Sequence, residues 1–249
     1  MYRFVLLMLL LATATTAARA QKIIEKTAPV AAGQRVFLNL KQGSSIRIRA
    51  GAAGQLTLKA TVSINQNKLN DAFQLGVASA GGELKVESTL DKEQLRSATA
   101  CDCPSGDGMY YGNWDDRRTH GTDSAGPSHR RGYGVCVQIS YDITLPPGVA
   151  LRVSTYSANI DIAGLSGPIE AKSLSGFVDV AWPAGVGAEL ALKTITGEVY
   201  TDQAIAFSSA PPKNPTVGYQ LRGTLGGSGG GPLVRLESIS NDVHFRKRK

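Results

Sequence analysis

The sequence is poor in the residue types on which most catalytic and metal sites depend. Its 249 residues include three histidines and three cysteines, and aromatic residues make up 6%. It contains no His-Glu-x-x-His helix and no glycine-rich phosphate loop followed by lysine, and its Gly-x-Ser-x-Gly match at 226–230 lies in a glycine run with no helix after it, unlike a nucleophile elbow. The common hydrolase, metalloprotease and nucleotide-binding motifs are therefore excluded, and we expect a non-enzymatic protein without a metal or cofactor.

Long apolar runs are also scarce, and the one near the start is too short for a membrane anchor. Residues 4–11 are uninterruptedly apolar, whereas a spanning helix needs roughly 20 such residues. Arg3 precedes this run and Ala18-Arg19-Ala20 follows it, the arrangement of a secretory signal. We expect residues 1–20 to be removed and the protein to reach the periplasm, the outer surface or the medium, with no transmembrane anchor.

Residues 21–249 are predicted to form a single β domain. Glycine is abundant, at 28 residues, which suits short strands joined by tight turns. Apolar and polar residues alternate over 36–40, 46–48, 56–62, 84–87 and 135–143, the pattern of half-buried strands. Residues 69–75 fit either a short helix or a loop.

Residues 97–134 form a polar insert with almost no aliphatic residues. A structureless loop of this length is uncommon inside a domain and is usually functional or disordered. An exported protein meets an oxidising environment, so a disulfide is expected between Cys136 and either Cys101 or Cys103, with the third cysteine unassigned.

The insert is the best candidate for ligand recognition. Flat aromatic side chains beside charged groups suit sugar rings, and a disulfide would lower the cost of ordering the loop on binding. The alternative is a tied-down loop whose aromatic residues only pack on the scaffold. The candidate binding residues are Tyr110, Tyr111, Trp114, Arg117, Arg118 and Tyr133.

From residue 151 a repeat appears, in which an alternating strand, a small polar turn and a second alternating strand recur. The copies cover 151–162, 171–180, 192–200 and 236–245. Their turn hydroxyls, at Ser157, Ser175, Thr196 and Ser240, lie 18, 21 and 44 residues apart. Because the last gap is about two periods, we expect one degenerate copy near residues 219–223.

One strand pair cannot bury its apolar face alone, so the copies are expected to stack and share a core. The predicted architecture is a single-stranded β-solenoid or β-helix-like stack of short strands, and the alternative is a β-sandwich of ordinary hairpins. Gly176, Gly197 and Asn241 follow the turn hydroxyls, where a positive φ is expected. The predicted inward positions are Val153, Ile160, Ile162, Val178, Val180, Leu192, Val199, Leu236, Val243 and Phe245.

Two charged features lie on this scaffold. Asp161 and Asp179 occupy matching places in consecutive copies and would form an exposed acidic ladder. Paired carboxylates can act as acid and base or hold calcium, but outward strand positions are normally polar, and the solvated face is favoured. Residues 246–249 form a basic tail, for which solvation is favoured over contact with an anionic partner.

These repeats resemble the bacterial putative-adhesin family of β-strand-repeat proteins, related to head-GIN adhesin domains. The resemblance rests on residues 41–48, on the Ser/Thr-Gly-x-Val turns, and on the glycine-rich segment 225–231 with the strand pair after it. It covers most of residues 34–247 apart from the insert. It implies a stacked β-coil fold and an envelope or surface location, and it brings no catalytic residues.

The sequence thus predicts an exported, adhesin-like envelope or surface protein that displays loops to glycans or to surface and envelope proteins. Its partners are not expected to include nucleic acid. One alternative is a periplasmic structural or signalling partner, and a second is a glycan-active enzyme on a solenoid scaffold. The sequence leaves the oligomeric state open.

Overall fold

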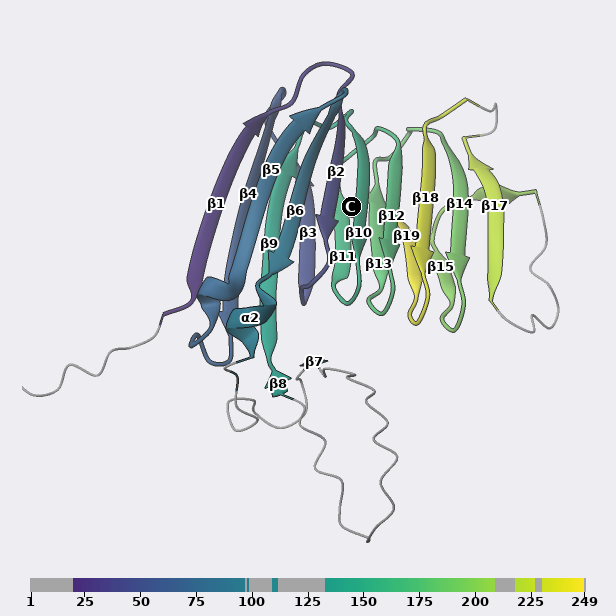
Figure 1. The fold of residues 1–249 in the computed structure, drawn as a ribbon. Coiled ribbons are helices and arrows are strands. Elements are labelled where there is room, and N and C mark those ends of the chain that lie inside the picture. The colour runs from purple at the N-terminus through teal and green to yellow at the C-terminus, as the bar shows by residue number, and fades with distance from the viewer. Residues whose placement is uncertain are drawn as a thin grey trace, which may run out of the picture.

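The alternating segments form strands, which the structure, a computed structural model, assembles into two large mixed sheets (Figure 1). It describes residues 20–96, 98, 135–208, 218–226 and 230–248, and the backbone alone at 109–111 and 133–134. The all-β prediction is confirmed. Within the described residues the helical segments are short: the 3₁₀ turn η1 (Asn70–Ala72) and α2 (Lys92–Leu95).

The first sheet, called sheet A, has eight strands. In spatial order they are β1 (Lys22–Pro29), β4 (Gln55–Ile64), β9 (Val137–Leu145), β3 (Ser45–Ala50), β11 (Asn159–Ala163), β13 (Val178–Trp182), β19 (Val243–Lys247) and β15 (Val199–Thr201). β1, β4 and β9 pair antiparallel, and the pairs from β9 to β15 are parallel.

The second sheet, called sheet B, has nine strands and faces the viewer in Figure 1. In order they are β16 (Ile205–Phe207), β17 (Tyr219–Leu225), β14 (Ala188–Thr194), β18 (Leu233–Ser238), β12 (Ile169–Ser173), β10 (Ala150–Thr155), β2 (Arg35–Leu40), β6 (Glu83–Leu90) and β5 (Phe73–Ala80). A separate small sheet pairs β7 (Met109–Tyr111) with β8 (Tyr133–Val135).

Each predicted repeat supplies one strand to sheet B and the next to sheet A. The pairs are β10/β11, β12/β13, β14/β15 and β18/β19, and β2/β3 adds a fifth with the same arrangement. Neighbouring copies pair in parallel with equivalent residues opposite one another, as Ile160 with Val178 and Val178 with Val243. The repeat is therefore structural as well as sequential.

The order of the copies in space differs from their order in the chain. β18/β19 lies between β12/β13 and β14/β15, so the last copy is interior to the stack. The prediction of a degenerate copy near residues 219–223 is wrong. Those residues belong to β17, which lies in sheet B and pairs antiparallel with β14. The long gap between copies holds the antiparallel pair β16/β17 instead.

The two sheets enclose one apolar core. Of the predicted inward positions all are buried except Val199, which is half-buried in the short strand β15. Trp182, Tyr141 and Phe245 are the largest fully buried side chains, and the rings of Trp182 and Phe245 lie 6.0 Å apart. The alternation of the sequence thus correctly assigned the core face.

A ladder of buried hydroxyl groups joins the copies at the turn between the sheets. The Ser173 Oγ accepts a bond from the Gly176 N–H (2.9 Å) and donates to the Ala158 carbonyl of the preceding copy (3.0 Å). Ser238 donates in the same way to the Gly176 carbonyl at 2.9 Å. Thr194 then donates to the Asn241 carbonyl at 2.9 Å, so the ladder follows the spatial order of the copies.

The expected positive φ at Gly176, Gly197 and Asn241 is wrong. The described residues with positive φ do not include these three. Gly176 is required for close approach, because a Cβ there would lie 2.1 Å from the Ala158 carbonyl oxygen, and one at Gly197 would lie 2.2 Å from the Asn241 oxygen. The glycines therefore permit tight stacking of the turns.

The predicted basic tail begins inside a strand. Arg246 and Lys247 belong to β19, and the Lys247 N–H donates to Asp202 Oδ1 at 2.6 Å. The Arg248 N–H donates to the Trp182 carbonyl at 2.8 Å, so the backbone here is bound to the scaffold, while residues 246–248 are exposed to solvent as predicted. Lys249 lies outside the described residues. No helix in the described part of the chain has the length and apolarity needed to cross a membrane.

Candidate functional site

Most of the insert predicted as a ligand-binding loop lies outside the described residues. These include Trp114, Arg117, Arg118, Cys101 and Cys103. Tyr110 and Tyr111 fall in β7 and Tyr133 in β8, and the pairing places Tyr111 opposite Tyr133. Only the backbone of these tyrosines is described, so their binding role stays a prediction. The pairing of Cys136 with Cys101 or Cys103 also stays a prediction, because these two lie outside the described residues.

The residue that ends the insert is fixed to an unusual turn. Cys136 is buried, its N–H donates to Asn65 Oδ1 at 2.8 Å, and its carbonyl accepts from the Asn65 N–H at 3.0 Å. Asn65, Gln66 and Asn67 have φ values of 47°, 55° and 68°, a left-handed run that side chains rarely adopt. Cys136, just after the insert, is thus held to the Asn65 turn by two hydrogen bonds of its backbone.

The outer face of sheet A carries a row of polar side chains that crosses all eight strands. Strand register places each member opposite the next, and the charges run as two acid–base alternations followed by two aspartates. In order the members are Glu25, Lys59, Asp142, Arg47, Asp161, Asp179, His244 and Tyr200.

Asp161 and Asp179 lie side by side in this row as predicted, but each is paired with an arginine. The two terminal nitrogens of the Arg49 guanidinium donate to the Asp161 carboxylate, at 3.0 and 2.6 Å. Arg246 makes an equivalent two-point contact with Asp179, which raises the pKa of this arginine. The expected acidic ladder is therefore charge-compensated, and this favours an interpretation as a structural element over a calcium or acid–base site.

The row ends in an aromatic cluster made by β15, β19 and Phe177, the residue just before β13. The rings of Tyr200 and His244 stack with centroids 5.1 Å apart, and Phe177 meets His244 edge-on at 6.2 Å. The Tyr200 hydroxyl donates to Glu198 at 2.8 Å, and this carboxylate raises the pKa of the phenol. A flat, partly exposed aromatic surface of this kind is suited to contact with a ligand or partner.

The opposite end of the same face is hollowed. A shallow depression of about 620 Å³ lies over β1, β4, β9 and β3. Glu25, Lys59, Asp142, Arg47 and Arg49 are among its lining residues, and Arg47 is 3.2 Å from Asp142. Basic residues outnumber acidic ones in its lining, and Arg47 and Arg49 are each paired with an aspartate.

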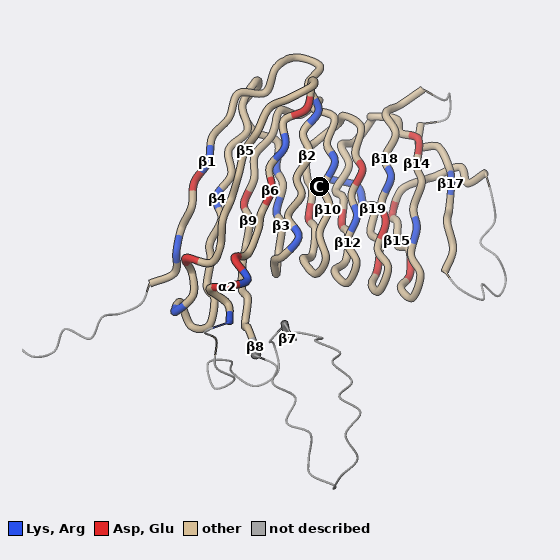
Figure 2. The backbone as a smooth tube through the Cα atoms, in the orientation of Figure 1, with Lys and Arg blue, Asp and Glu red and all other residues tan. Residues whose placement is uncertain are grey.

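The outer face of sheet B carries a second set of charged rows (Figure 2). Lys172 and Lys193 flank Glu237 in register, with nitrogen–oxygen distances of 3.3 and 3.1 Å. Burial by itself raises the pKa of Glu237, but the two lysines outweigh it, so the pKa lies below the ordinary value. Arg152 is 3.7 Å from Glu170 and also lies over the Phe37 ring, at 4.8 Å.

Sequence reasoning identified Asp161 and Asp179 but missed the rows that contain them. The polar residues that form these rows could be recognised at the outward positions of every alternating strand. The register between strands far apart in the chain, such as Arg47 opposite Asp142, was not readable from periodicity alone. In the described residues no three His, Cys, Asp or Glu side chains come together as metal ligands.

Comparison with known proteins gives no family assignment. No protein-family profile and no curated protein sequence matches the chain. Among solved structures, a putative cell adhesion protein from Clostridium sporogenes aligns over 92% of this chain and 100% of its own, with 10% identity and a TM-score of 0.48. A putative adhesin from Bacteroides fragilis aligns over 91% and 97%, with 10% identity and a TM-score of 0.23. Neither likeness is close enough to carry an argument about function.

Proposed function

We propose that this protein is an exported, non-enzymatic, adhesin-like binding or structural protein of the cell envelope. The observation that carries the proposal is the pair of broad sheet faces, on which charged side chains are arranged in cross-strand rows. Rows such as the one from Glu25 to Tyr200 span a whole sheet and are held by ion pairs at fixed spacing. Such a face suits contact with an extended ligand or a partner protein.

The architecture that supports this role is best regarded as a stack of two-strand coils. Five strand pairs follow one another in parallel register, and buried hydroxyls bond four of the turns in series. A sandwich of hairpins would instead pair successive strands antiparallel within one sheet. The stack fixes its outward side chains before any ligand arrives, which lowers the ordering cost of binding.

The polar insert is the second element of the proposed binding function. In the chain it follows α2 and ends at β8. Substitution of Trp114 by alanine is expected to weaken glycan binding while leaving the circular dichroism spectrum unchanged. Unchanged binding would restrict recognition to the sheet faces.

Protease shaving of intact cells tests the location on which the proposal depends. A known periplasmic protein serves as the control for envelope integrity. Loss of this protein while the control survives would support display at the surface. Full protection would overturn the surface role, and the periplasmic structural or signalling alternative would then be tested by affinity purification from the periplasmic fraction.

A further inference from the structure

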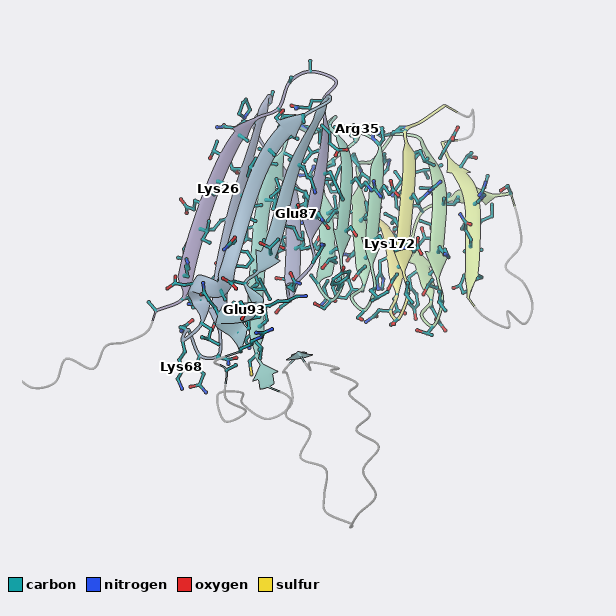
Figure 3. All side chains as sticks on the ribbon, viewed as in Figure 1. Lys26, Arg35, Lys68, Glu87, Glu93 and Lys172 are labelled. Carbon is teal, nitrogen blue, oxygen red and sulfur yellow. The ribbon has the colours of Figure 1, made fainter. Side chains whose placement is uncertain are left out.

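Neighbouring hollows, together called the groove, lie along the outer face of sheet B. Three neighbouring hollows of about 360, 320 and 210 Å³ lie over β2, β10, β12, β18, β14 and β17. All three share Arg235 as a lining residue, so this arginine stands at the centre of the groove. In Figure 3, the labels Arg35 and Lys172 mark the β2 and β12 part of the same face.

Ala191 forms the floor of the groove between two arginines. Strand register places it opposite Arg235 of β18 on one side and Arg222 of β17 on the other. It occupies an outward position of β14, yet it is only 6% exposed. The long arginine side chains therefore cover a residue too small to fill the space between them.

The end of the groove around Ala191 is rich in positive charge. Lys172 and Lys193 share the single carboxylate of Glu237, and Glu189 is the other acidic residue that lines this end. Among the ion pairs between described residues, none includes Arg222 or Arg235. Two guanidinium groups thus face the groove with donors available to an anion.

The arginines recur on every second strand. Register aligns Arg152, Glu170, Arg235, Ala191 and Arg222 in one row across β10, β12, β18, β14 and β17. Adjacent strands lie about 4.8 Å apart, so the arginines recur at roughly 10 Å. That interval is on the scale of one disaccharide.

We propose that this groove binds a linear acidic polysaccharide with one carboxylate in each disaccharide unit. Arg235 and Arg222 bind the carboxylates of successive disaccharide units. Glu170, between Arg152 and Arg235, accepts hydrogen bonds from the hydroxyl groups of the neutral sugar above it. Glu170, between Arg152 and Arg235 in the row, disfavours a polymer with a charge on every unit, such as a nucleic acid. The inference rests on the proposed binding function and specifies its ligand class.

Titration of the purified chain with hyaluronan oligosaccharides, which carry one carboxylate per disaccharide, tests the proposal. Dextran provides the neutral probe, and polygalacturonate and single-stranded DNA provide densely charged ones. Hyaluronan is expected to bind best, and more weakly as salt rises, because exposed charges are screened.

Two substitutions and a matched control locate the site. Ala191→Glu would place a carboxylate between the two arginines, and Arg235→Gln would remove the central guanidinium; each is expected to weaken hyaluronan binding about tenfold, the loss of one charge-assisted contact. Ala181→Glu makes the same change beside Arg246 on the outer face of sheet A and should leave affinity within about twofold. Unchanged melting temperatures would exclude misfolding.

Three results would overturn the proposal: no hyaluronan binding by the parent chain, equal loss in Ala181→Glu, or equal affinity for polygalacturonate or DNA. Each is distinguishable from failure of the proposed function. A chain that is removed by protease shaving but does not bind hyaluronan would refute the ligand class alone.

Discussion

The two ends of the strand stack join neighbouring turns with different chemistry. In the carboxy-terminal copies, Ser173, Ser238 and Thr194 bury a hydroxyl that bonds its own turn and the next one. In the amino-terminal pair β2/β3, Leu40 takes the equivalent place, because Asn39 before it pairs with Ser154 before Thr155. Apolar packing there replaces a polar ladder.

At the amino-terminal end the turn carbonyls are satisfied from outside the ladder. The Tyr141 hydroxyl donates to the Gln42 carbonyl at 2.8 Å, and Ser157 donates to the Gly43 carbonyl at 3.0 Å. Where similar copies are neighbours, the same hydroxyl contact repeats from one turn to the next. The first pair instead adjoins the longer strand β9, whose Tyr141 side chain makes the contact. We expect the ladder end to tolerate less change in backbone spacing than the tyrosine end.

The largest effect is expected from adding a methyl group where the ladder turns touch. Gly176→Ala would place a Cβ 2.1 Å from a backbone oxygen and should lower the free energy of unfolding by about 3 kcal/mol. Gly43→Ala should cost less, because the obstacle is the Tyr141 ring at 2.9 Å. Urea denaturation measures both, with Gly148→Ala, which meets nothing within 4 Å, as the control. Equal costs at Gly176 and Gly43 would contradict the comparison.

Removing one ladder hydroxyl should have the next largest effect. Ser173→Ala leaves the Gly176 N–H and the Ala158 carbonyl without their buried partner and is expected to cost about 2 kcal/mol. Ser175→Ala, two residues later on the exposed turn, should change stability by less than about 0.5 kcal/mol. Thermal unfolding of the two variants would show whether the buried hydroxyl or the turn hydroxyl stabilises the copy.

The tyrosine end should be selectively sensitive to alkali. Burial raises the pKa of Tyr141 well above its ordinary range, so the neutral phenol stabilises the folded chain fully below the unfolded pKa. Above about pH 10 that contribution is lost by roughly 1.4 kcal/mol per pH unit. Tyr141→Phe should remove this part of the decline, which urea titrations from pH 8 to 11 would measure. Parallel declines in both proteins would refute this assignment.

The smallest effects are expected from the surface ion pairs between strands of sheet A. Arg49→Gln breaks the bond from β3 to Asp161, a pair that is well exposed, and should cost about 0.5 kcal/mol. Arg246→Gln should cost more, because the Asp179 side chain is only 14% exposed. Differential scanning calorimetry at low and high salt separates the two, and a larger cost for Arg49→Gln would reverse the predicted order.

The sequence predicted which face of each strand is buried better than it predicted which strands pair. Alternation at Val153, Ile160 and Val178 assigned the core side correctly, since a strand has a period of two whatever it pairs with. Pairing depends on long-range register, and the spacing between copies suggested an extra copy where β17 turns back antiparallel to β14. Periodicity alone does not distinguish these two arrangements.

The candidate sites were predictable to a smaller extent. Asp161 and Asp179 were found because they recur in consecutive copies, but their arginine partners come from β3 and β19, which lie far away in the chain. Arg235 and Arg222 gave no signal, since each is one more outward basic residue in an alternating strand. Their common feature is Ala191 between them, and only the register of β14 with both neighbours reveals it.

The interior place of β18/β19 has a consequence for the order in which the chain can fold. A chain that folds from its amino terminus can dock β12/β13 on β10/β11 at once, but β14/β15, although β14 can pair with β17, cannot join the stack until residues 233–247 arrive. The stack is therefore completed by insertion, and its final contacts connect distant residues, which slows folding. Removing residues 233–248 would take out a middle layer and separate β14–β17 from the remainder.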